Sequence, residues 1–153
     1  MSQKNWSTNS PRETKILGFL LGEILKKSKH RRSSVILGLC GPLGSGKTIF
    51  IKGLAKGLGI KKKILSPTFV IVKNYKLKTK NWQTLYHFDC YRIKDPKEIL
   101  NLGFAQIVND CKNIVVIEWA EKIKKILPKN AVWLKFKYGK KKNERIIQTI
   151  QTI

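Results

Sequence analysis

Acidic side chains are scarce in this sequence. Nine Asp and Glu residues stand against 32 Lys and Arg residues, so the 153-residue chain carries a formal net charge of +23 at pH 7. Such a surface favours polyanionic partners, including RNA. An equally weighted interpretation is that lysine has accumulated throughout the chain and leaves a solvated basic surface without a specific site. Charge alone therefore leaves the partner open.

Cysteines and long apolar runs are also few. Cys40, Cys90 and Cys111 are odd in number and far apart, which fits neither a disulfide framework nor a CxxC metal pair, so we expect buried free thiols. No apolar run approaches the roughly 20 residues of a membrane span. Residues 1–12 are polar and lack the apolar stretch of a secretory signal. These absences predict a cytoplasmic protein that does not enter a membrane.

The length and composition predict one domain, residues 1–153. With 42% hydrophobic residues, the chain can bury a core without disulfides or a structural metal. The sequence shows no repeat at solenoid periods and no low-complexity linker beyond short lysine clusters. We therefore expect a single active site.

Helix and strand patterns alternate along the first half of the chain. Ser10-Pro11-Arg12-Glu13 is typical of a helix start, with a capping box and Pro at the first helical position. Apolar residues then recur at helical spacing until the basic segment 26–32. Residues 35–40 form a short apolar run typical of a buried strand, and residues 49–58 return to helical spacing. The predicted order is helix, strand and helix.

The second half adds further strands to this pattern. We predict strands at 69–75, 85–89 and 114–117, a short helix from Asp95 to a stop at Gly103, a helix at 120–127, and a closing hairpin of 131–138 and 145–150. Alternating helices and strands favour a parallel sheet. The sequence therefore predicts an α/β fold, with a mostly parallel sheet flanked by helices and an antiparallel C-terminal hairpin.

A glycine-rich loop connects the strand at 35–40 to the following helix. It reads Gly41-Pro42-Leu43-Gly44-Ser45-Gly46-Lys47-Thr48, a complete phosphate-binding pattern. Its glycines let the backbone curl so that successive N–H groups point at phosphate oxygens, while the next helix contributes the positive end of its dipole. Gly41, Gly44, Ser45 and Gly46 are therefore predicted to bind phosphate. The loop indicates a P-loop NTPase-type domain.

Lys47 and Thr48 end this loop and carry its side-chain chemistry. Lys47 is expected to reach the β- and γ-phosphates as a point charge, and the Thr48 hydroxyl to bind the magnesium that bridges them. The sequence contains neither the Asn-Lys-x-Asp signature of GTPases nor a following Asp-x-x-Gly switch. We therefore predict ATP and Mg²⁺ as the cofactors, in preference to GTP.

Two carboxylates at strand ends are candidates to complete the site, where they can hold the metal, its waters or the attacking water. Glu118 follows four aliphatic residues, 114–117, which is the Walker B pattern. Asp89 ends the strand at 85–89 and would lie beside the loop if that strand neighbours residues 35–40. We predict that both carboxylates lie on the magnesium side of the nucleotide.

Three further residues are candidates on weaker patterns. Thr68 lies in Ser66-Pro67-Thr68-Phe69, where P-loop proteins often sense the γ-phosphate through a hydroxyl, although a simple Ser/Thr turn explains the pattern nearly as well. His87 alternates onto the same strand face as Asp89, and we give it a supporting role. Trp119 could line the nucleotide pocket, but an aromatic residue after a buried strand usually packs in the core.

The ordered set of motifs resembles the bacterial TsaE (YjeE) ATPase family, which is needed for threonylcarbamoyladenosine in tRNA. The resemblance extends over nearly the whole chain and rests on residues 41–48, 66–69, 87–92, 98–103 and 116–119. It implies a protein that binds ATP and magnesium, hydrolyses ATP slowly by itself, and works with the TsaB and TsaD partners. Those partners modify adenosine 37 of tRNAs that read codons starting with adenine. Contact with the tRNA itself would be indirect or weakly electrostatic.

The resemblance also implies roles for individual residues. Lys47 and Thr48 would hold phosphate and metal, Asp89 and Glu118 would complete the metal and water shell, and Thr68 would belong to the nucleotide-sensing segment. Lys47, Glu118, Asp89 and Thr68 are thus the predicted catalytic residues.

Two other functions remain open. A small P-loop kinase would usually close an Arg-bearing lid over its acceptor, but only five arginines occur and none clusters as a lid. A nucleotide-switched RNA-binding protein would use the positive charge and keep the loop as a switch. No arginine finger is evident in the sequence, and such a residue is worth roughly 10³ to 10⁵ in rate. We therefore expect weak activity from the isolated protein.

Overall fold

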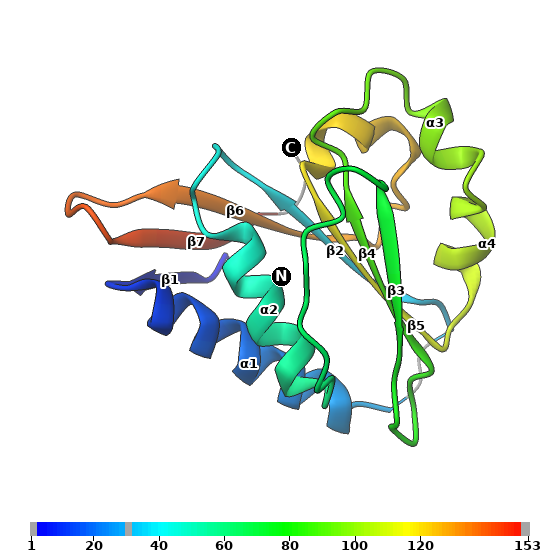
Figure 1. Cartoon of the computed structure of the whole chain (residues 1–153), viewed down its shortest axis with the longest axis horizontal. Helices are drawn as coiled ribbons and strands as arrows, with labels where there is room; N and C mark the ends of the chain where they lie inside the picture. Colours follow the sequence, from blue (N-terminus) through cyan, green and yellow to red (C-terminus); the bar gives the residue numbers. More distant parts are fainter. Residues whose placement is uncertain (1–2, 30–31, 151–153) are drawn as a thin grey trace.

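A seven-stranded sheet forms the centre of the computed structural model, which describes residues 3–29 and 32–150 (Figure 1). The strand order is β1-β7-β6-β2-β5-β4-β3. The strands are β1 (Asn5–Thr8), β2 (Val35–Cys40), β3 (Val72–Lys76), β4 (Thr84–Asp89), β5 (Asn113–Glu118), β6 (Val132–Tyr138) and β7 (Arg145–Ile150). The helices are α1 (Pro11–Lys27), α2 (Lys47–Gly57), α3 (Lys97–Leu100), α4 (Phe104–Asn109) and the 3₁₀ helix η1 (Ala120–Ile126).

The four central strands, β6, β2, β5 and β4, run parallel to one another. Strands that are covered on both faces read as continuous apolar runs, which is why residues 35–40 and 114–117 stand out in the sequence. The outer pairs β6–β7, β1–β7 and β3–β4 are antiparallel. The predicted α/β fold, with a mostly parallel sheet and an antiparallel C-terminal hairpin, is confirmed.

Helices cover both faces of the sheet, with α1 and α2 on one side and α3, α4 and η1 on the other (Figure 1). Alternate residues of β2 serve the two faces, because successive side chains of a strand point in opposite directions. Leu37 and Leu39 pack with the α2 residue Leu54, whereas Ile36 packs with Phe104 of α4. No described helix has the length and apolar content required to cross a membrane.

The backbones of α1 and α2 are in direct contact through glycines, a feature that the sequence analysis did not anticipate. A Cβ atom on Gly53 would overlap the carbonyl oxygen of Lys15, and a Cβ on Gly18 would overlap that of Phe50. Only glycine leaves room for this approach. It fixes α2, and with it the loop that precedes α2, against the rest of the fold.

Several predicted boundaries differ from the structure. Residues 69–71, expected to begin a strand, form a turn in which the N–H groups of Val70 and Ile71 donate to the carbonyl of Pro67 at 3.0 and 2.7 Å. Gly103 separates two short helices, α3 and α4, and does not end the helical region. Strand β1 was not predicted, because its four residues show no apolar alternation and gain their pairing only from β7.

Candidate nucleotide-binding site

The predicted phosphate loop lies at the carboxyl ends of the parallel strands, between β2 and α2. This edge is where ligands bind in open parallel sheets. Gly41 has a positive φ of 136°, and a Cβ there would overlap the carbonyl oxygen of Phe136 on β6. Ser45 is fully buried within the loop. The backbone is therefore held in its curled form by packing against the neighbouring strand.

Lys47 lies inside the loop, with its ammonium group on the loop carbonyls. Its Nζ donates to the carbonyl oxygens of Gly41 at 2.6 Å and Pro42 at 2.9 Å, and lies 4.0 Å from the centroid of the Trp119 ring. Burial lowers the pKa of Lys47, and the nearby Glu118 carboxylate acts in the opposite direction. Its Nζ also lies 3.5 Å from the Ser45 hydroxyl oxygen, so its partners are neutral oxygens and an aromatic face. A desolvated cation with such partners interacts strongly with an anion that reaches it.

Glu118 connects β5 to the loop helix. Its Oε2 accepts a hydrogen bond from the Thr48 hydroxyl at 2.8 Å, and its Oε1 lies 2.9 Å from Nε2 of the fully buried His87. Within the described residues, Nδ1 of His87 has no hydrogen-bond partner. The three side chains come from α2, β5 and β4, and only the fold brings them together. The supporting role expected for His87 takes a definite form here, because its ring orients the Glu118 carboxylate.

Thr48 and Glu118 provide the hard oxygen ligands that magnesium prefers. The described residues contain no group of three or more His, Cys, Asp and Glu side chains that could hold a metal ion on its own. Magnesium typically binds through one or two carboxylates together with substrate phosphates and water. The donor set at Thr48 and Glu118 therefore fits a magnesium ion that arrives with a nucleotide.

Asp89 lies beside Glu118 but has different partners. Its strand, β4, neighbours β5 and not β2, so the condition under which Asp89 was expected beside the loop, a strand next to residues 35–40, is not met. Asp89 pairs in register with Glu118 instead. Its Oδ2 accepts hydrogen bonds from Ser66 at 2.9 Å and Thr68 at 2.8 Å, and its Oδ1 accepts from the Tyr91 N–H at 3.0 Å. In this structure Asp89 anchors the segment that contains Thr68.

The segment from Ser66 to Ile71 is held at one end and exposed at its tip. Phe69 is 84% exposed, and its ring lies 4.7 Å from the Arg92 guanidinium. Ile71 has a positive φ of 66°, which is unfavourable for a β-branched residue. The segment therefore has a base anchored on Asp89 and an exposed apolar tip.

The C-terminal hairpin contributes two residues that the sequence analysis missed. Nη2 of Arg145 donates to the carbonyl of Gly44 at 3.2 Å, and the Tyr138 hydroxyl donates to the carbonyl of Leu43. The Arg145 guanidinium also lies 5.0 Å from the Tyr138 ring. No local motif marks either residue, since β6 and β7 reach the loop only through the order of the strands.

Trp119 differs from its expected role as a core residue. Its side chain is half-buried and supports Lys47, and its ring lies 5.1 Å from that of Tyr91. Its φ is +58°, an uncommon conformation for a residue other than glycine. The core interpretation is therefore incomplete, because the ring packs against the core cluster and also lies close to the Lys47 ammonium of the loop.

A parallel sheet with a glycine-rich strand–loop–helix connection, and an acidic residue ending the adjacent strand, is the P-loop NTPase fold. The structure is similar to the crystal structure of YdiB from Bacillus subtilis, with a TM-score of 0.71 and 32% identity over 97% of this chain and 84% of that one. The family model "Threonylcarbamoyl adenosine biosynthesis protein TsaE" matches residues 8–147. The chain therefore belongs to the TsaE family.

Two curated relatives illustrate the similarity. The tRNA threonylcarbamoyladenosine biosynthesis protein TsaE of Bacillus subtilis is 36% identical over 137 residues, which cover 90% of this chain and 79% of the relative. The protein of the same name from Rickettsia felis is 42% identical over 120 residues, covering 78% of this chain. The aligned region spans 64% of that Rickettsia protein and 62% of its Rickettsia conorii counterpart, slightly less than two thirds.

Proposed function

We propose that this protein is an ATPase that binds Mg-ATP at the phosphate loop and hydrolyses it to support threonylcarbamoyladenosine formation in tRNA. Membership of the TsaE family supports the pathway. The observation that supports hydrolysis best is the Glu118 carboxylate, which is hydrogen-bonded to Thr48 and His87 and lies at the strand end nearest the loop. A carboxylate held in this way can orient water for attack on a phosphoryl group.

The residues of the site would divide the work as follows. Loop N–H groups and the amino end of α2 bind the phosphates, and Lys47 exchanges its carbonyl partners for phosphate oxygens. Thr48 and Glu118 would hold a magnesium ion, which when bound would supply positive charge to the phosphates. His87 positions Glu118, while Arg145 and Tyr138 hold the loop by its carbonyls.

Activation by a partner fits the geometry of the Thr68 segment. Thr68 and Ser66 bind Asp89 in this structure, and the exposed Phe69 tip leaves the segment accessible. We propose that the TsaD and TsaB subunits, which catalyse the transfer to adenosine 37, order this segment and accelerate hydrolysis. The Arg145 guanidinium is bonded to the Gly44 carbonyl of the loop and does not act as an arginine finger. We therefore propose that a partner supplies the additional positive charge that stabilises the transition state.

The test is threonylcarbamoyladenosine formation over several turnovers in a reconstituted tRNA reaction. Wild-type protein, Glu118→Ala, Glu118→Gln and a reaction without the protein are compared. Glu118→Gln retains hydrogen-bonding atoms towards Thr48 and His87 but removes the charge, so it separates the chemistry of the carboxylate from its structural role. We expect sustained turnover with the wild type alone, and normal ATP binding by Glu118→Gln.

Two results would contradict the proposal. If the same amount of threonylcarbamoyladenosine forms when the protein is omitted, the protein has no role in this reaction. Transfer of the labelled γ-phosphate to an acceptor other than water would identify a kinase.

A further inference from the structure

A hollow lined by lysines runs along α2 and past its carboxyl-terminal end, whereas the phosphate loop lies at its amino-terminal end. Its volume is about 650 Å³, and its lysines are Lys15, Lys52, Lys56 and the exposed triplet Lys61, Lys62 and Lys63. We call this hollow the lysine groove. A second hollow of about 570 Å³ shares residues 59–62 and extends along β3 to Lys76 and Lys78.

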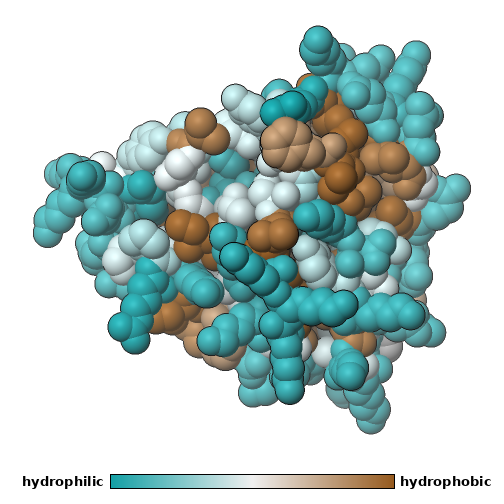
Figure 2. Space-filling view, viewed as in Figure 1, coloured by the Kyte–Doolittle hydropathy of each residue, from teal (hydrophilic) through white to brown (hydrophobic). Residues whose placement is uncertain are grey.

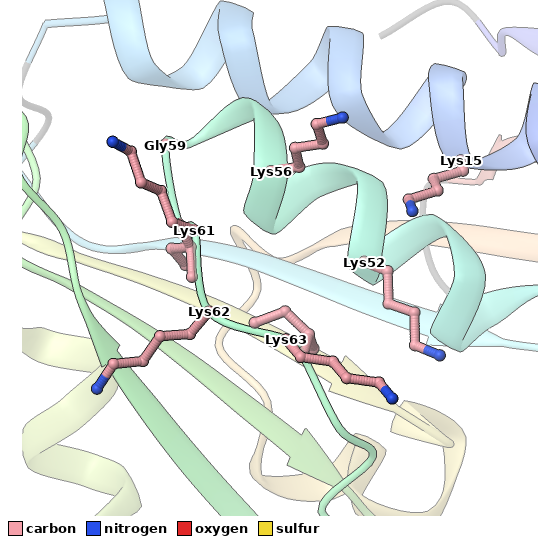
Figure 3. Close-up of a pocket in the computed structure, with 9 residues that line it drawn as sticks. Lys15, Lys52, Lys56, Gly59, Lys61, Lys62 and Lys63 are labelled. Atoms are coloured by element: carbon pink, nitrogen blue, oxygen red, sulfur yellow. The ribbon is translucent and has the colours of Figure 1, made fainter.

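The lysines of the groove come from separate parts of the chain. Figure 3 shows Lys15 on α1, Lys52 and Lys56 on α2, and the triplet 61–63 on the segment that follows Gly59. In Figure 2, long hydrophilic side chains project over the part of the surface where α1 and α2 lie in Figure 1. The tertiary structure therefore concentrates at one place charges that are dispersed in the sequence.

No carboxylate neutralises the groove. Neither hollow has an Asp or Glu among its lining residues. Within residues 3–29 and 32–150, none of the groove lysines forms a salt bridge; the nearest ionic pair in sequence is Lys26 with Glu23, 3.6 Å apart. Unpaired charges of one sign repel each other and raise the local potential. An anion that binds there relieves this repulsion.

The arrangement suits a chain of phosphates better than a single small anion. A single phosphate needs donors that converge, but the ammonium groups in Figure 3 are spread around the hollow and point in different directions. Lysines contact phosphates as point charges without bidentate geometry and without reading bases. An RNA backbone presents one negative charge per nucleotide along an extended path, so it can contact several separated cations in turn.

We propose that the lysine groove binds the phosphate backbone of tRNA, on a surface distinct from the phosphate loop. The identification of the RNA as tRNA rests on the proposed function, whereas binding of RNA phosphates rests only on the groove. Because none of the residues that line the groove belongs to the phosphate loop, nucleotide and RNA can be held together.

The experiment measures binding of an unmodified tRNA transcript to the full-length protein by fluorescence anisotropy, without nucleotide or partners. The test variant is K61Q/K62Q/K63Q. The matched control is K140Q/K141Q/K142Q, which removes the same charge from three exposed lysines at the hairpin turn. A second test variant, K52Q/K56Q, removes charge from the α2 wall.

Removing three phosphate contacts should lower the steepness of log Kd against log salt by about 2 to 3 and raise Kd roughly tenfold or more at low salt. K52Q/K56Q should act in the same direction, and the control triplet much less. Equal losses from both triplets would show that only total charge matters, which overturns the proposal. So would equally tight binding of poly-L-glutamate, because the groove would then accept acidic proteins.

This assay is independent of the ATPase proposal. If the protein binds tRNA through the groove but fails to hydrolyse ATP, the groove proposal stands and the proposed enzymatic function is rejected. Groove variants that keep wild-type ATP hydrolysis but lose tRNA binding would support both the groove and the proposed ATPase function.

Discussion

The regions at the two ends of α2 carry their positive charge in different surroundings. At the amino-terminal end, one buried lysine, backbone N–H groups and two carboxylates lie in a network with defined partners and distances. At the other end, the lysine groove gathers solvated side chains that have no carboxylate near them. The first arrangement suits a ligand of one geometry, whereas the second suits an extended ligand that can be held in many ways.

The difference follows from desolvation. Charges taken out of water interact strongly and must be matched by precisely placed partners. Exposed charges interact weakly one by one, are screened by salt, and gain affinity by number. Substitutions at the phosphate-loop end should therefore have large individual effects, and those in the groove should accumulate.

The largest effect is expected from Lys47→Ala. In the proposed function, loss of the buried ammonium removes the side-chain charge that would contact the transferred phosphate, and we expect kcat/KM for ATP hydrolysis to fall roughly 10² to 10³-fold. Binding of tRNA should be unchanged, because Lys47 lies at the opposite end of α2. Steady-state phosphate release and anisotropy are measured, with the exposed Lys125→Ala as a control. If ATP hydrolysis and tRNA binding fell by the same factor, the phosphate loop and the lysine groove would have to be one site.

Gly53→Ala tests the element that the two regions share. The added methyl group would force α1 and α2 apart at the Lys15 carbonyl, and such overpacking costs about 1–3 kcal/mol of unfolding free energy. Both ATP and tRNA binding should weaken together. Gly38→Ala is the milder comparison, since a Cβ there would be 3.1 Å from the Ala120 side chain. Urea unfolding gives the free energies, and equal stability of the two variants would contradict the close helix contact.

Arg145→Ala sharpens the description of the phosphate-loop end. Its guanidinium holds the loop through the Gly44 carbonyl, and loss of one hydrogen bond from a charged donor should raise the Kd for ATP by about tenfold. Tyr138→Phe, which removes a neutral hydrogen bond to Leu43, should have a smaller effect of a few-fold. Isothermal titration with a non-hydrolysable analogue measures both. Wild-type affinity in both variants would show that the hairpin does not support the loop.

The smallest effect concerns the thiols that flank the site. Cys40 and Cys90 are buried free thiols, as expected, while Cys111 is half-buried. Burial raises the pKa of Cys90 from 9.0 to about 12, so its contribution to stability is complete below pH 9 and is lost as the pH rises towards 12. The destabilisation caused by Cys90→Ala should therefore shrink by about 1 kcal/mol between pH 8 and pH 10. A difference that does not change with pH would indicate a solvated thiol.

Local and continuous features could be read from the sequence. The phosphate loop, the capping box at Ser10 and the apolar strand before Glu118 each lie within a few consecutive residues. Each can therefore be recognised from the sequence without knowledge of the tertiary structure. The turn at residues 69–71 could not be read correctly. Its apolar residues resemble a strand, but hydrogen bonds to the Pro67 carbonyl hold them in a turn at the surface.

The sequence by itself determined the α/β fold, because residues on strands buried at both faces must be apolar without interruption and a phosphate loop must be contiguous. Only the tertiary structure decided that β4 neighbours β5, which places Asp89 beside Glu118. It also brings the Thr68 hydroxyl within hydrogen-bond distance of the Asp89 carboxylate. It also brought Arg145 to the loop and gathered the groove lysines from α1, α2 and the segment after Gly59. These contacts join residues distant in sequence, and no local pattern encodes which distant residues will meet.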